Sequence, residues 1–115
     1  MKQLILSLGF LALLSCGSKT VNLESHDTQS KTVIRVLGEK ESSLDPFRVN
    51  ITVEANGLKE HVATEIYAGT IDSTNLKFDW REPGVCLMTF TQQDNTTRKI
   101  LAVALEDKIG LKEME

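Results

Sequence analysis

The chain has 115 residues, of which 41% are hydrophobic and 25% charged, with a formal net charge of −3 at pH 7. This length is enough for one small domain. A negative balance without a basic cluster argues against nucleic-acid binding, which depends on neutralising phosphates with Lys and Arg. We therefore expect one small domain and no nucleic-acid partner.

An uncharged apolar segment lies at the start of the chain. Residues 4–14 (LILSLGFLALL) follow Lys2 and run for eleven residues without a charge. A membrane-spanning helix needs about 20 apolar residues, whereas the apolar core of a secretory signal has about 7 to 15. Small residues of the kind that a processing enzyme binds, Ser15-Cys16-Gly17-Ser18, come directly afterwards. We therefore predict that residues 1–15 are a signal peptide rather than a membrane span.

The residues Leu13-Leu14-Ser15-Cys16 resemble the lipobox of bacterial lipoproteins, and the looser form of the Bacteroidota most of all. Leu13 and Ser15 match the pattern well, whereas Leu14 is bulkier than the usual residue. The resemblance implies cleavage before Cys16, a diacylglycerol on its sulfur and an acylated amino terminus. Two or three acyl chains would anchor the chain stably, because each buried methylene contributes about 0.8 kcal/mol. An ordinary signal peptide with an accidental cysteine is the alternative.

Residues 16–31 are predicted to be the lipidated cysteine and a flexible tether. Segment 17–31 is polar, and a flexible coil of this length would reach about 20 Å. A short edge strand around residues 20–23 is the alternative. Neither an aspartate directly after Cys16 nor an early acidic run is present, and the first acidic residue is Glu24. By resemblance to known sorting signals, these features indicate the periplasmic side of the outer membrane.

Residues 32–115 are predicted to form an all-β domain, a small antiparallel β-sandwich. Apolar and polar residues alternate, and turn residues interrupt the pattern every eight to twelve positions. The expected strands lie at residues 33–37, 47–55, 58–67, 76–80, 85–92 and 97–105. Segment 100–105 is apolar on both faces, which is typical of a strand covered on both sides or of one that meets a partner protein.

The clearest element is a β-hairpin over residues 47–67. Its turn is Asn56-Gly57, the dipeptide that best tolerates the positive φ angles of a type I′ turn. The two-residue loop fixes a register that pairs Phe47 with Ile66, Ile51 with Val62, Ala55 with Leu58, Arg48 with Glu65 and Glu54 with Lys59. The apolar pairs share one face and the opposite charges share the other, which favours the hairpin over the alternative of a helix over residues 57–67.

Residues 78–90, followed by residues 94–97, resemble the last hairpin of bacterial immunoglobulin-like modules. The likeness consists of the Pro83-Gly84 turn, the alternating strand after it and an Asp/Asn turn before the last strand. The chain lacks the cysteine pair of antibody domains and the tyrosine two residues before Cys86. The resemblance therefore implies an immunoglobulin-like sandwich and no particular activity. The predicted core consists of Phe47, Ile51, Val53, Val62, Ile66, Phe78, Leu87, Phe90, Leu101 and Val103.

Few residues offer catalytic or metal-binding chemistry. Cys86 and His61 are the only candidates for a nucleophile and its base, but Cys86 lies in an apolar strand and is expected to be a buried small hydrophobe. With Cys16 acylated, Cys86 has no disulfide partner. On a strand, His61 and Glu65 would lie about 13 Å apart, which is too far to share a metal ion. We expect no enzyme activity, no metal and no cofactor.

Trp80 and Arg81 form the candidate contact with a partner, because tryptophan and arginine at a loop mouth are typical of binding hot spots. A tryptophan that fills the core is the alternative. We predict a non-enzymatic, lipid-anchored module that binds a protein or envelope component. An inhibitor or immunity protein that blocks an enzyme and a carrier of a small apolar ligand are the alternatives.

Overall fold

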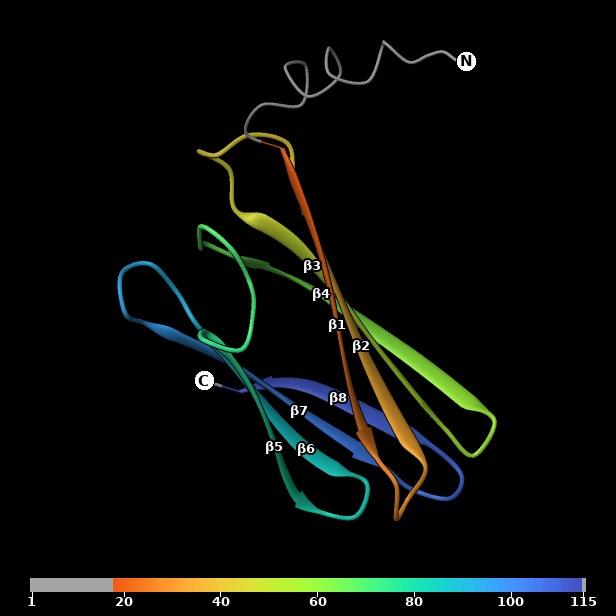
Figure 1. Cartoon of the computed structure of the whole chain (residues 1–115). Helices are drawn as coiled ribbons and strands as arrows, with labels where there is room; N and C mark the ends of the chain where they lie inside the picture. The colour runs from red at the N-terminus through yellow and green to blue at the C-terminus, as the bar shows by residue number, and fades with distance from the viewer. Residues whose placement is uncertain (1–17, 115) are drawn as a thin grey trace, which may run out of the picture.

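The computed structural model describes residues 18–114, which form eight β-strands and no helix (Figure 1). Every pairing between neighbouring strands is antiparallel. Within residues 18–114, no helix could cross a membrane. The strands are β1 (Lys19–Asp27), β2 (Thr32–Lys40), β3 (Phe47–Ala55), β4 (Leu58–Ile66), β5 (Leu76–Glu82), β6 (Val85–Thr91), β7 (Thr97–Ala104) and β8 (Ile109–Met114).

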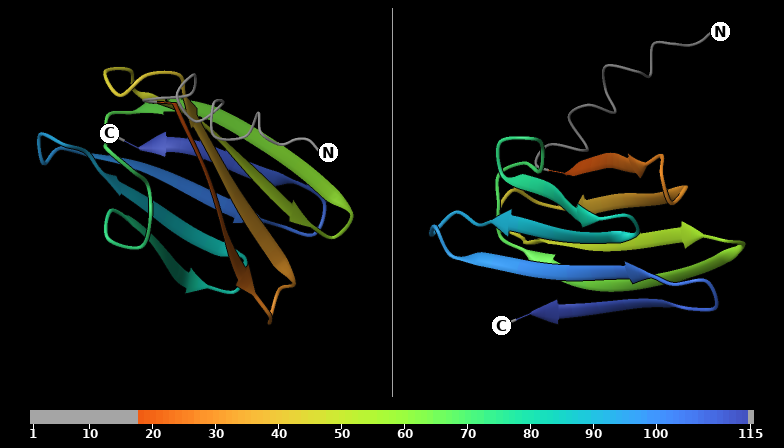
Figure 2. Two further views of the ribbon diagram at one scale, coloured as in Figure 1. Left: turned by 45° about the horizontal axis from the view of Figure 1, so that its top comes forward. Right: turned by 90° about the horizontal axis from the view of Figure 1, so that it is seen from below.

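The strands form two sheets that pack face to face, which confirms the predicted all-β sandwich (Figure 2). Sheet A has the order β1-β2-β3-β4 and sheet B the order β5-β6-β7-β8. Each sheet is therefore a meander of consecutive strands, whereas immunoglobulin domains have Greek-key connections. The largest fully buried side chains lie between the sheets and include Phe47, Phe90, Ile34, Ile51, Ile66, Met88 and Ile100.

The predicted hairpin over residues 47–67 is confirmed with its register. β3 pairs with β4 from Phe47↔Ile66 to Ala55↔Leu58, so residues 57–67 are not a helix. Asn56 and Gly57 have φ angles of 55° and 77°, as a type I′ turn requires. Glu54 and Lys59 form the expected ion pair, with 3.7 Å between Oε2 and Nζ.

One expected charge pair of this hairpin differs in detail. Arg48 lies opposite Glu65 in the register, but its guanidinium forms an ion pair with Glu41, at 4.0 Å. Both groups of this pair are well exposed, so the side chain of Arg48 turns along the strand without burial on either side.

The prediction of a flexible tether over residues 16–31 is wrong for the part that the structure describes. β1 pairs with β2 along its whole length, from Lys19↔Lys40 to Asp27↔Thr32, and is much longer than the alternative edge strand. Two residues of β1 that point toward sheet B are polar, and each of them accepts a hydrogen bond from that sheet. The Ser25 hydroxyl accepts a hydrogen bond from Trp80, and the Asp27 carboxylate accepts one from the backbone N–H of Gly84.

The predicted core residues of sheet A are correct. In β6 and β7 of sheet B, most of the predicted residues belong to the opposite face of the strand. Five predicted residues are fully or almost fully buried, namely Phe47, Ile51, Val53, Ile66 and Phe90, and two more pack partly buried against them, namely Val62 and Phe78. Leu87, Leu101 and Val103 are instead on the outer face of sheet B. The inward positions of β6 and β7 are taken by Cys86, Met88, Phe90, Ile100 and Ala102.

The two ends of the sandwich differ in their connections. At one end lie Ser18, the β2–β3 loop (residues 41–46), the β4–β5 connection (residues 67–75) and the β6–β7 loop (residues 92–96) (Figure 1). We call this the Ser18 end. Ile71 of the long connection is 3% exposed and closes the core there. The opposite end carries the tight turns at Asn56-Gly57 and Pro83-Gly84, and we call it the Pro83 end.

Candidate functional site

The outer face of sheet B carries a stripe of branched aliphatic side chains on its two central strands. Val85 of β6 lies opposite Val103 of β7, and Leu87 lies opposite Leu101. We call these four residues the apolar stripe. All four are partly exposed, whereas their sequence neighbours Cys86, Ile100 and Ala102 are buried on the inner face. The stripe is thus additional to the apolar surface that the two-layer core needs.

The surface beside the stripe is open at β8. Gly110 of β8 lies opposite Val103, and a Cβ placed on this glycine would meet no atom within 4 Å. Two larger apolar side chains lie at the margins, Leu105 directly after β7 and Met114 at the end of β8, which are 46% and 40% exposed. Contiguous apolar surface can mark interaction sites in soluble proteins, and this face is therefore the candidate surface.

Basic residues border the stripe. Lys112 of β8 lies opposite Leu101, and Lys99 of β7 lies two positions along the strand on the same face. Asp79 lies opposite Leu87, and its carboxylate is paired with Arg81 at 2.5 Å. Glu82, which lies opposite Val85, adds a second carboxylate at the β5 edge, so the basic side chains Lys99 and Lys112 border the stripe on the β7–β8 side.

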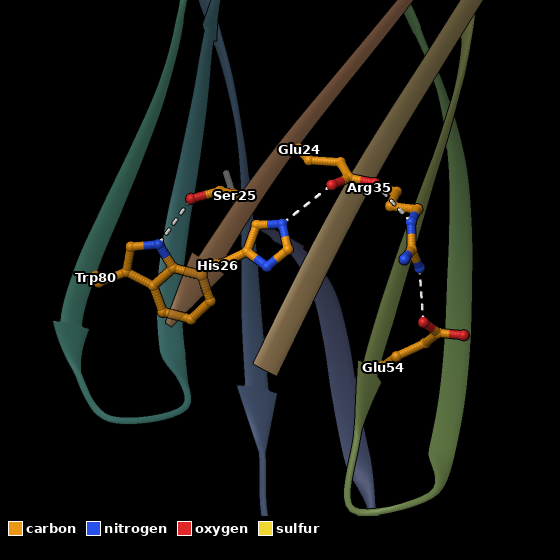
Figure 3. A network of polar contacts seen from close by, with 6 residues as sticks. All are labelled: Glu24, Ser25, His26, Arg35, Glu54 and Trp80. Carbon is orange, nitrogen blue, oxygen red and sulfur yellow. Dashed lines mark hydrogen bonds and ion pairs between the residues drawn. The ribbon is translucent and has the colours of Figure 1, made fainter. Parts of the chain in front are cut away.

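The outer face of sheet A is a network of charged groups (Figure 3). Arg35 of β2 bridges two carboxylates, with 2.8 Å from Nε to Glu24 and 2.6 Å from Nη1 to Glu54. His26 adds a 3.0 Å contact to Glu24. Hydrogen bonds from His26 and Arg35 lower the pKa of Glu24, and the hydrogen bond from Arg35 lowers that of Glu54. This face has the composition of a solvated surface.

Trp80 and Arg81 point in different directions. Trp80 packs partly buried against the core, and its indole Nε1–H donates a 2.9 Å hydrogen bond to the Ser25 hydroxyl of β1 (Figure 3). A register shift after Trp80 places Arg81 and Glu82 together opposite Val85. Arg81 is exposed there at the edge of the apolar stripe. The two residues therefore do not form one contact surface: Trp80 joins the sheets, and the partner contact of Arg81 stays a prediction.

The other candidates of the sequence lie apart from one another. Cys86 is fully buried opposite Trp80, and burial raises the pKa of its thiol to about 12. His61 is exposed on the outer face of β4, and His26 is on β1 rather than in a tether. Among residues 18–114, no group of three or more His, Cys, Asp or Glu side chains could hold a metal ion. Cys86 and His61, the predicted nucleophile and base, are therefore on different sheets and do not meet.

A hollow of about 480 Å³ lies on the outer face of sheet A. Charged side chains, Glu39, Arg48 and Glu65, are prominent in its lining. A pocket for an apolar ligand is instead lined mainly by hydrophobic and aromatic side chains. This hollow therefore does not suit the small apolar ligand considered from the sequence.

The described residues thus define a two-layer β-sandwich with one mainly polar outer face and one that carries the apolar stripe. Comparisons with protein-family models, with curated proteins and with solved structures found no match. The predicted signal peptide and the lipid-attachment residue Cys16 lie outside the described residues. The described chain begins at Ser18, two positions after Cys16.

Proposed function

We propose that the protein is a non-enzymatic lipoprotein of the cell envelope that binds a partner protein through the apolar stripe. The observation that carries the proposal is the partly exposed row of Val85, Leu87, Leu101 and Val103 on the outer face of sheet B. Aliphatic side chains in this number are not needed on a solvated face, as sheet A illustrates. A partner that covers them would remove their apolar surface from water, which is favourable at about 25 cal/mol per Å² before the costs of association.

The shape and charge of the face indicate the kind of partner. Small-molecule sites are concave, whereas the stripe is a row of side chains on the outer face of a sheet, with open space at Gly110 beside Val103. An apolar centre with a polar rim is typical of protein interfaces. The basic border formed by Lys99 and Lys112 favours a partner whose own rim is acidic, because complementary charges speed encounter and fix orientation.

The proposal places the protein at the outer membrane, on its periplasmic side, with the anchor on Cys16. Support comes from the resemblance of Leu13-Leu14-Ser15-Cys16 to a lipobox and from the lack of an aspartate directly after Cys16. Replacing Cys16 with Ser should abolish acyl labelling and release the protein from membranes or leave it as precursor. Unchanged labelling and membrane fractionation in that variant would refute the anchor.

Site-specific photo-crosslinking tests the partner face. A photoreactive amino acid at Leu101 should give a crosslinked product in intact cells, whereas the same group at Thr52, in the middle of the outer face of sheet A, should not. The mass of the product distinguishes a second copy of this chain from another protein. Equal crosslinking from both positions, or none from Leu101 at normal protein levels, would contradict the assignment of the stripe.

The two alternatives are separated by the same experiment. An inhibitor or immunity protein would crosslink to one enzyme with 1:1 stoichiometry, and the purified pair would lose that enzyme's activity. A carrier of an apolar ligand would need an interior cavity, but Phe47, Phe90 and Met88 fill the space between the sheets. The outer stripe is therefore a better-supported binding surface than the interior.

A further inference from the structure

Leu44 is the most exposed of the large hydrophobic side chains within residues 18–114, at 90%. It lies in the β2–β3 loop at the Ser18 end, far from the apolar stripe in the fold (Figure 1). The loop is ordered by two short-range hydrogen bonds to Ser42, from the backbone N–H of Leu44 to its hydroxyl and from that of Asp45 to its carbonyl, both at 3.1 Å. The backbone is thus held in a turn while the side chain of Leu44 stays in water.

The loop lies directly beside the point where the described chain begins. Lys19 is opposite Lys40, so residue 41 follows at the level of Ser18. Ser18 and Ser43 line the same small hollow, of about 280 Å³. The start of β1 is also fixed to the β4–β5 connection, because the ammonium group of Lys19 donates a 3.2 Å hydrogen bond to the carbonyl of Gly69. These segments therefore form one surface at the Ser18 end.

The length of chain before Ser18 determines what faces this surface. Cys16 precedes Ser18 by two residues, which span at most about 7 Å when fully extended. A membrane that holds acyl chains on Cys16 must therefore lie against the Ser18 end. Tyr67 is at the same end and is 52% exposed, and tyrosine is enriched at membrane–water interfaces because its ring is apolar and its hydroxyl polar.

We propose that Leu44 inserts into the surface of the membrane that anchors Cys16, as a second contact beside the lipid. This inference rests on the proposed lipidation of Cys16. Asp45 is adjacent to Leu44, and its carboxylate would be repelled by anionic headgroups, whereas Glu41 of the same loop is paired with Arg48. The lipid surface that fits is therefore one of zwitterionic headgroups. Two contacts, one on each side of the hollow, would hold the sandwich upright with the Pro83 end away from the membrane.

The test uses the full chain purified from membranes, with mass spectrometry to establish lipid on Cys16. An environment-sensitive dye is attached at Ser43→Cys, next to Leu44, and in a control at Gln29→Cys in the exposed β1–β2 turn of the Pro83 end. Labelling is selective because Cys86 is fully buried. The proteins are then reconstituted in phosphatidylcholine–phosphatidylethanolamine vesicles that contain lipid with a nitroxide quencher on the acyl chain.

We expect strong quenching of the dye at position 43 and little at position 29. Adding Leu44→Ser to the Ser43→Cys protein should lower the ratio of inserted to free loop by about tenfold, as the transfer free energy of a leucine side chain predicts. Circular dichroism would show that this exposed substitution leaves the fold intact. Replacing half of the zwitterionic lipid with phosphatidylglycerol should weaken insertion.

The outcomes separate the two proposals. Lipid on Cys16 together with equal quenching at positions 43 and 29, or with quenching that Leu44→Ser does not change, would overturn the insertion of Leu44 and leave the anchor standing. A purified mature protein without lipid would overturn the anchor and, with it, this inference. Because the vesicles contain no other protein, quenching at position 43 that depends on Leu44 would identify lipid as the contact.

Discussion

The two outer faces of the sandwich differ although both belong to four-stranded antiparallel meanders. On sheet A, Arg35 joins Glu24 and Glu54, and the face is mainly polar. On sheet B, valine and leucine occupy the corresponding central positions of β6 and β7. The inner faces alone supply the core that holds the sheets together. The aliphatic residues on the outer face of sheet B lie outside this core, and we propose that they bind a partner.

The sharpest test of this contrast compares two neighbours on β7. Ile100 is fully buried on the inner face, whereas Leu101 is partly exposed on the outer face. Ile100→Ala should lower the free energy of unfolding by about 2–5 kcal/mol because it removes buried methyl groups and leaves a cavity. Leu101→Ala should cost less than half of this. Denaturant titrations measure both, and equal losses would mean that Leu101 is covered and the stripe is part of the core.

A smaller change in the free energy of unfolding is expected for substitutions at the edge where β1 and β5 meet. Trp80→Phe keeps most of the ring but removes the indole N–H that donates to Ser25. The loss of this hydrogen bond should lower the free energy of unfolding by about 1 kcal/mol. Ser25→Ala removes the acceptor and serves as the matched variant. If the bond links the sheets, the double variant should lose less than the sum of the single losses, and full additivity would argue against the link.

The smallest change in stability is expected from the charged groups on the outer face of sheet A. The pKa values of Glu24 and Glu54 lie below the ordinary value of 4.5, so their ionised forms stabilise the folded state. This contribution is complete above pH 4.5 and is lost as the pH falls through the lowered values. Arg35→Met should flatten the dependence of stability on pH below about 4.5, whereas Arg48→Met, at a looser and more exposed pair, should not. Identical acid titrations of the two variants and the parent would refute the role of Arg35.

How much the sequence reveals depends on whether each strand has one apolar face. The β3–β4 hairpin could be predicted to the residue because its pattern alternates and Asn56-Gly57 fixes the turn. β1 was missed because Ser25 and Asp27 occupy inward positions, where they bond to the edge of sheet B rather than to water. A polar residue at such a position conceals the alternation of a strand.

The candidate surfaces were only partly predictable for a related reason. β6 and β7 are apolar on both faces, so no pattern could decide whether Leu87 or Met88 points inward, although the sequence did indicate that segment 100–105 has two apolar faces. Trp80 and Arg81 are neighbours in sequence, yet a register shift sends them to different surroundings. Leu44 is a single leucine in a polar loop, and its exposure becomes visible only when the loop is placed in the fold.

The early start of β1 would limit the distance from the membrane at which an anchored protein can meet a partner. If Cys16 carries the proposed lipid, the two residues between Cys16 and Lys19 would hold the sandwich close to the membrane. A nine-residue strand is about 30 Å long, so the apolar stripe would stay within a thin layer next to the membrane. Confinement to this layer would raise the effective concentration of the apolar stripe near partners in the same membrane. It would also keep the stripe from partners farther away. Lengthening this short linker would therefore change which partners are within reach without altering the binding face.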